Sequence, residues 1–98
     1  NQGRKVTGIV CYNDPMAAGA LSALSDNGIQ VPTQISVIGF DDVLITNYLQ
    51  PHLTTIRYPV MEMATQAARL AIALAHGEPA PDVTNLFIPT LVRRYSVT

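Results

Sequence analysis

The sequence predicts an α/β fold in which a parallel sheet is flanked by helices. Short apolar runs of strand length alternate with longer segments whose apolar residues recur at helical spacing. Each helical segment also begins close behind a strand-like run. This order is typical of parallel strands that are joined by right-handed crossover helices.

The first half of the chain predicts one strand–helix–strand unit, with strands at residues 6–12 and 35–40 and a helix at 16–25. Both strand-like runs are largely apolar, as expected for parallel strands that are buried on both faces. Asp14 is well placed to cap the helix, and Pro15 suits its first turn. Asn27–Gly28 is a typical helix end, and a turn over 29–34 follows.

The second half predicts a short irregular or helical segment at 43–49, a strand at 53–57, a long helix at 60–76 and strand-like runs at 85–88 and 91–97. The long helix has an apolar stripe at positions 60, 63, 64, 67, 71 and 74. Gly77 would end this helix. Pro89 separates the last two runs, which predicts a bend or a crossing there.

Composition limits the classes of function. Of the 98 residues, 48% are hydrophobic and 13% are charged, and the net charge is −1. Such a chain can bury a core, and it offers no basic face for the DNA backbone. No run approaches the roughly 18 apolar residues of a membrane span. The single cysteine, Cys11, allows no disulfide framework within one chain, which suits the cytoplasm, and no signal peptide is visible in this sequence. The chain does not begin with Met, and we expect it to be an excerpt of a longer protein.

Two polar pairs follow the first two strands, Asn13–Asp14 and Asp41–Asp42. Ligands of open α/β sheets bind at the carboxyl ends of the strands. Neighbouring strands would bring the two pairs within about 5–10 Å of each other. A carboxylate accepts from two adjacent hydroxyl groups, and a carboxamide both donates and accepts. This combination suits a sugar, whereas acids would repel a phosphate.

Each acid also has a simpler interpretation. Asp14 is more easily explained as the helix cap, and Asp42 could brace the turn at Val43. Asn13 and Asp41 therefore remain the main candidates for ligand contact. Paired carboxylates also serve glycoside hydrolysis, but the sequence has no Trp and only 6% aromatic residues to form a sugar subsite. We expect no catalytic site.

Metal and cofactor sites are not expected either. The only potential soft or imidazole ligands, His52, His76 and Cys11, lie on different elements without the spacing of a metal site. No glycine-rich phosphate loop is present. Arg57 and Tyr58 lie between a predicted strand and the long helix, where a hinge between two lobes is one interpretation; Arg57 could also be simply a solvated strand end.

Four motifs together resemble the lactose/galactose repressor family in order and spacing: CYNDPMAAGAL, ISVIGFDDV, PHLTTIRYP and PTLVRR. The resemblance covers nearly the whole chain and is strongest to the galactose repressors and isorepressors. The segments N-D-x-M-A-x-G, G-[FY]-D-D and P-x-L-T-T are its most specific parts. Periplasmic sugar-binding proteins share the first two of these segments more loosely.

The resemblance implies a two-lobed core, like that of the periplasmic binding proteins, behind an N-terminal helix-turn-helix domain. Residues up to about 57 would belong to the C-terminal lobe, about 60–88 to the N-terminal lobe, and about 90–98 to the return crossing. The effector would lie between the lobes. By motif, Asn13 and Asp41 would contact it, and Tyr58 would line the hinge.

The resemblance also implies a partner for this chain, a second copy of itself. The family's dimer face falls on Ala18, Leu21, Ser22, Tyr48 and Leu49. The expected function is that of a sugar-responsive transcriptional repressor with a galactose-like effector and no cofactor. Operator DNA would be bound only through the helix-turn-helix domain, which this sequence lacks. A periplasmic sugar-binding protein of a transport system is the alternative, and a sugar-processing enzyme is a third hypothesis.

Overall fold

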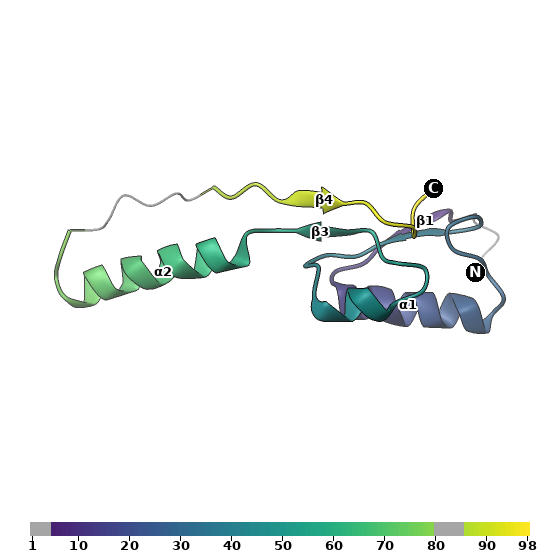
Figure 1. Ribbon diagram of the computed structural model, residues 1–98, viewed down its shortest axis with the longest axis horizontal. Helices are drawn as coiled ribbons and strands as arrows, with labels where there is room; N and C mark the ends of the chain where they lie inside the picture. The colour runs from purple at the N-terminus through teal and green to yellow at the C-terminus, as the bar shows by residue number, and fades with distance from the viewer. Residues whose placement is uncertain (1–4, 80–85) are drawn as a thin grey trace. The chain divides into compact units, whose positions relative to one another are not determined.

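The computed structural model describes residues 5–79 and 86–98. Its elements are β1 (Gly8–Val10), α1 (Asp14–Asp26), β2 (Ser36–Ile38), the 3-10 helix η1 (Leu44–Tyr48), β3 (Thr55–Arg57), α2 (Val60–Ala75) and β4 (Thr90–Val92) (Figure 1). Both predicted helices and the short helical segment are present. The strands are shorter than the apolar runs that predict them.

The chain forms two compact units. The first unit runs up to Arg57 and resumes at Thr90, and the second runs from Tyr58 to Pro89. These divisions fall where the sequence predicts the chain to pass between lobes. That the units correspond to the two lobes stays a prediction.

The strands of the first unit form a mixed arrangement. β1 and β2 are parallel, as predicted, with Ile9 opposite Val37. An isolated parallel bridge between Ile38 and Thr54 joins β2 to the segment that enters β3. β3 and β4 are antiparallel. Three neighbouring segments are therefore parallel, and only the strand that follows the second unit runs the other way.

The core of the first unit lies between α1 and these strands. Its buried members are Ala17, Leu21, Val37 and Leu53. Figure 1 shows α1 along one face of the strands. Leu21 is only 6% exposed, although the resemblance implies a place for it on a dimer face. The reason is helical geometry, because Leu21 lies four residues after Ala17 and so on the same, inward side of α1.

The start of α1 differs from the prediction. Asn13, not Asp14, is the N-cap: its backbone is extended and its side-chain oxygen accepts a hydrogen bond of 2.9 Å from the Met16 amide. Asp14 is the first residue of the helix, where a negative charge interacts favourably with the helix dipole. The far end agrees with the prediction, since Asn27 is the C-cap and Gly28 follows with a φ of 68°.

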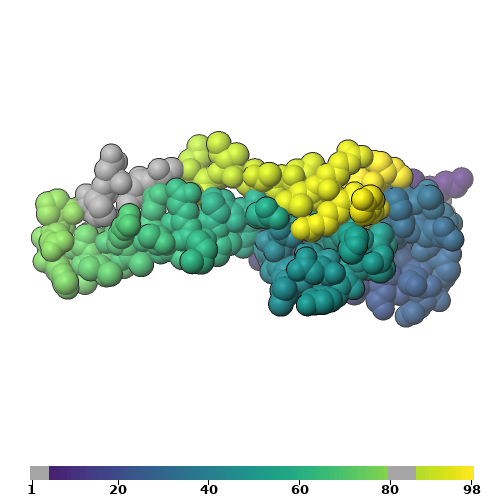
Figure 2. Space-filling view, in the orientation of Figure 1, coloured from purple at the N-terminus to yellow at the C-terminus, as the bar shows by residue number. Residues whose placement is uncertain are grey.

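The C-terminal segment is part of the first unit. The buried Ser96 hydroxyl donates to the Val37 carbonyl and accepts from the Thr54 amide at 2.8 Å. The Val37 amide in turn donates to the Ser96 carbonyl at 2.8 Å. Figure 2 shows this yellow segment lying directly against the teal one. One serine thus joins β2, the entry to β3 and the chain after β4.

The second unit contains α2 and the described residues 86–89. Most of the predicted apolar stripe of α2 is exposed, with Val60 at 50% and Leu74 at 61%. The less exposed residues of α2 are Met63, Gln66, Leu70 and Ala73. The strand-like run at 85–88 is not confirmed: residues 86–88 are not in a strand, and residue 85 lies outside the described residues.

Candidate functional site

The candidate site lies where β1 and β2 end. The backbone ladder between these strands continues beyond them, through the Cys11 amide to the Ile38 carbonyl at 2.9 Å. It ends with the Asp14 amide, which donates to the Phe40 carbonyl at 3.0 Å. The structure thus brings the two predicted polar pairs to one edge of the sheet, as neighbours on adjoining strands.

Asn13 contributes a hydrogen-bond donor to this edge. Its side-chain oxygen is occupied as the helix cap. Its Nδ2 group has no hydrogen-bond partner among the residues that the structure describes, and the side chain is half-buried. The cap also fixes the orientation of the carboxamide. Asn13 can therefore present N–H groups to a ligand, although its role in binding stays a prediction.

Asp41 contributes an acceptor to the same edge. Its amide donates to the Ile56 carbonyl at 2.9 Å, so its backbone is tied to β3. No residue within 5–79 or 86–98 is hydrogen-bonded to its carboxylate, which is half-buried. Its φ of 109° lies in a region that L-residues rarely adopt. The edge thus offers a donor from Asn13 and an acceptor from Asp41, a pair that complements hydroxyl groups.

Unlike Asn13, Asp14 has a side chain that is fully occupied by contacts within the fold. It is fully buried, and its carboxylate accepts hydrogen bonds from the Thr55 hydroxyl at 2.6 Å and from the Val43 amide at 2.8 Å. A Cβ atom on Gly39 would overlap this carboxylate. Asp14 therefore joins α1, β3 and the start of η1 beneath the edge and is not available to a ligand.

Asp42 is the centre of an ion cluster. Its carboxylate lies 2.6 Å from Arg57 Nη2 and 2.8 Å from Arg94 Nη2. Burial by itself raises the pKa of the Asp42 carboxyl, but hydrogen bonds and charge from Arg94 and Arg57 outweigh it and lower the pKa below its usual value. Asp42 also accepts a hydrogen bond of 3.3 Å from the Thr46 hydroxyl in the turn that begins at Val43, while the Val43 amide itself is bound by Asp14. Arg57 is exposed, as expected of a strand end, but it is also ion-paired with Asp42.

The remaining predicted site residues lie apart from the edge or outside the first unit. Tyr58 is the first residue of the second unit, and its carbonyl accepts from the Val60 amide at 2.8 Å. Ser22 and Tyr48 are exposed, while Ala18 and Leu49 are half-buried. The hinge role of Tyr58 and the dimer roles of these four residues stay predictions.

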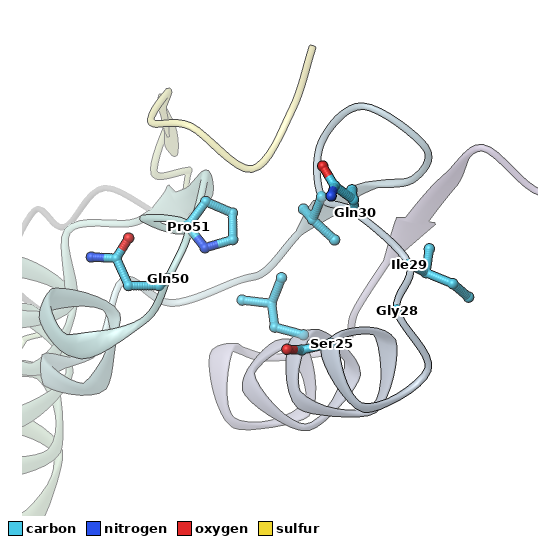
Figure 3. Close-up of a pocket in the computed structure, with 8 residues that line it drawn as sticks. Ser25, Gly28, Ile29, Gln30, Gln50 and Pro51 are labelled. Carbon is cyan, nitrogen blue, oxygen red and sulfur yellow. The ribbon is translucent and has the colours of Figure 1, made fainter.

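A separate pocket opens at the other end of α1 (Figure 3). It has a volume of about 280 Å³, and its lining comes from Leu21 and Ser25 of α1, from residues 28–31 and from Gln50–Pro51. Neither Asn13 nor Asp41 lines it. The edge that carries Asn13 and Asp41 is thus distinct from this pocket. Within the described residues, no helix is long and apolar enough to cross a membrane.

Comparison with known proteins agrees with the fold and with the motifs. The periplasmic binding protein-like domain family matches residues 2–97. The chain is 62% identical over 97 residues to the HTH-type transcriptional regulator GalR of Escherichia coli, covering 99% of this chain and 28% of that protein. It is 54% identical over 93 residues to GalS of Salmonella typhimurium, covering 95% and 27%. The chain thus spans about a quarter of the length of these relatives.

Solved structures show the same relationship. A LacI-type transcription regulator from Bifidobacterium animalis superimposes with a TM-score of 0.86 at 37% identity, over 99% of this chain and 35% of that one. A LacI-family regulator from Arthrobacter, solved in complex with lactose, gives a TM-score of 0.79 at 35% identity, over 96% and 36%. The motifs, the parallel strands and these matches lead to one conclusion: the chain belongs to the periplasmic binding protein-like domain family, within the lactose/galactose repressor group.

Proposed function

We propose that this chain is the effector-binding and dimerising portion of a sugar-responsive transcriptional repressor, and that it is not an enzyme. The observation that carries the proposal is the edge where Asn13 offers a donor and Asp41 an acceptor. Neither the Asn13 Nδ2 nor the Asp41 carboxylate has a partner among the described residues. The relatives GalR and GalS are named as HTH-type transcriptional regulators, which supports the regulatory role.

A galactose-like sugar is the proposed effector. Adjacent hydroxyl groups can donate to both oxygens of Asp41 and accept from Asn13, and this chemistry favours a neutral polyol over an anion. The lactose complex of the Arthrobacter regulator and the similarity to GalR support a galactosyl compound. A periplasmic sugar-binding protein of a transport system would use a similar edge, but the named relatives favour the regulator.

Operator DNA would be bound by a helix-turn-helix domain outside this sequence, because a net charge of −1 gives no electrostatic footprint for a duplex. The repressor would act in the cytoplasm, where its operator is. Effector and operator would then act at distinct sites. Their effects on each other's affinity must be reciprocal, whichever direction the regulation takes.

The test is the substitution Asp41→Ala in the intact protein. We expect the dissociation constant for D-galactose, measured by calorimetry, to rise by about tenfold to a hundredfold, as is typical for lost hydrogen bonds to a charged group. Operator affinity without sugar should be unchanged, and galactose should no longer alter it. Asp26→Asn, at the exposed end of α1, is the control for loss of a carboxylate. Unchanged galactose affinity in Asp41→Ala would refute the proposed site.

A further inference from the structure

We propose that Asp42 is a positioning residue for the effector edge: it holds the backbone turn that aims the Asp41 carboxylate at the ligand. This inference rests on the proposed function, because it takes Asp41 as the group that contacts the sugar. Asp42 itself has both carboxylate oxygens engaged by arginine and is therefore not offered as a ligand contact.

The backbone of this turn has an uncommon conformation at two successive residues. Asp41 has a φ of 109° and Asp42 a φ of 59°. Positive φ is uncommon in residues other than glycine, and two such residues in a row persist only where the surroundings hold them. A turn free to relax would return to negative φ, and relaxation at residue 41 would redirect its side chain.

Contacts on both sides hold this turn in place. On one side, the Asp41 amide is bound to the Ile56 carbonyl at 2.9 Å. On the other, the Asp42 carboxylate receives Arg57 Nε at 2.8 Å and Arg94 Nη2 at 2.8 Å, with the Thr46 hydroxyl at 3.3 Å. Arg57 Nη2 also lies 2.6 Å from the same carboxylate. These contacts of Asp42 come from three different segments of the described chain.

The two arginines support Asp42 to different degrees. The Arg57 side chain is 60% exposed, so water competes for its contact with Asp42. Arg94 is 22% exposed and is itself fixed, because its Nη1 donates to the Leu53 carbonyl at 2.9 Å and its amide donates to the Thr54 hydroxyl oxygen at 2.9 Å. Arg94 is therefore the rigid support, and Arg57 adds a weaker contact on the exposed side.

The consequence concerns affinity and not merely stability. Asp42 is 8% exposed, and removing its charge leaves the Arg94 guanidinium without its carboxylate beside the turn. The protein would remain folded around its core, but Asp41 would no longer be held in one orientation. The Asp41 carboxylate would then be poorly placed for the hydroxyl groups of the sugar, and the affinity of every folded molecule for the sugar would fall.

The experiment titrates D-galactose into the intact protein and its Asp42→Asn variant by calorimetry, reading affinity and stoichiometry separately. We expect the dissociation constant to rise about tenfold, with stoichiometry per chain unchanged. Loss of the ion cluster lowers the stability of the variant under either role, so the dissociation constant decides: a purely structural role would leave the dissociation constant of the folded fraction unaltered. That result would overturn the inference.

A second pair of variants keeps the test decisive if Asp42→Asn does not fold. Arg94→Lys retains the positive charge but has a single ammonium nitrogen in place of the two nitrogens that bind Asp42 and the Leu53 carbonyl, and it should weaken galactose binding severalfold at full stoichiometry. Arg57→Gln, at the exposed partner, should have a smaller effect. Unchanged affinity in Arg94→Lys, or equal effects at the two arginines, would count against Asp42 as the positioning residue.

The same titrations separate this inference from the proposed function. If Asp41→Ala binds galactose as tightly as the unchanged protein, the proposed site fails and the role of Asp42 fails with it. If Asp41→Ala loses binding while Asp42→Asn and Arg94→Lys bind normally, the proposed function stands and only the positioning role is refuted.

Discussion

The carboxylate of Asp14 and the hydroxyl of Thr55 are joined by a hydrogen bond of 2.6 Å, and both side chains are fully buried. The second oxygen of Asp14 receives the Val43 amide at 2.8 Å. One carboxylate thus fastens the first turn of α1 to β3 and to the start of η1. Asn13 and Asp41 occupy the chain on either side of this junction, so the geometry of the ligand edge depends on it.

Thr55→Val should destabilise the protein. Valine has nearly the shape of threonine but cannot donate, so one oxygen of the buried Asp14 would lose its partner. We expect the free energy of unfolding to fall by about 1–3 kcal/mol, measured by urea denaturation. Thr65→Val, at an exposed position of α2, is the matched control. Equal effects of the two substitutions would show that the buried hydrogen bond contributes little.

Two glycines should respond to alanine in opposite ways. A Cβ on Gly39 would overlap the Asp14 carboxylate and approach Leu53, whereas a Cβ on Gly19 would meet nothing within 4 Å. Gly39→Ala should cost about 1–3 kcal/mol through overpacking. Gly19→Ala, within α1, should stabilise by about 0.5–1 kcal/mol because alanine favours the helix. Melting temperatures should therefore move in opposite directions, and a shared direction would contradict the packing at Gly39.

Stability should depend on the ionisation of Asp42. Its pKa in the folded protein lies below the usual value, after the opposing effect of burial, because Arg94 and Arg57 favour the charged form. The stabilisation is therefore fully present above the ordinary pKa and is lost as the pH falls through the lowered value. The difference in unfolding free energy between the unchanged protein and Asp42→Asn should be constant near neutrality and shrink below about pH 4.

Urea midpoints measured across a pH series test this dependence, with Asp26→Asn as the control for loss of an exposed acid. A difference between the unchanged protein and Asp42→Asn that stays the same from neutral to acid pH would show that the ion cluster does not stabilise the fold.

The proposed dimer face is best tested at an exposed residue. Tyr48 is 76% exposed on η1, and a charge there would be buried without a partner if it lies between two copies. We expect Tyr48→Glu to convert dimer to monomer in sedimentation velocity. Tyr95→Glu, at a tyrosine that is 70% exposed, is the control. A Leu21→Lys variant is unsuitable, because Leu21 belongs to the core and its substitution would test folding instead.

Local patterns predicted the elements well. Apolar runs, the Asn27–Gly28 signal and the spacing of α1 predicted two parallel strands and the helix between them, because each of these features depends on neighbours along the chain. The choice of cap was wrong because Asn13 and Asp14 are both good caps. Which of the two acts as the cap depends on Thr55, because this residue of a distant strand donates a buried hydrogen bond to the Asp14 carboxylate.

No pattern of neighbouring residues predicted the ion cluster around Asp42. Asp42 and Arg94 are 52 residues apart, and Arg57 looked like a solvated strand end until the fold placed it beside Asp42. Similarly, the stripe of α2 followed from periodicity, but periodicity does not say which elements cover a helix. The chemistry of the edge was easier to predict, because strand ends gather at one side of a parallel sheet whatever the other contacts are.

The hydrogen bonds of Ser96 to Val37 and Thr54 also determine when the first unit can finish folding during synthesis. Residues 90–98 close a unit whose other part ends at Arg57, with the whole second unit translated in between. A nascent chain held at residue 89 would leave the Val37 carbonyl and the Thr54 amide unsatisfied. The first unit therefore cannot reach its native state until residues 90–98 have left the ribosome. Until then it is incompletely folded and accessible to proteases and chaperones.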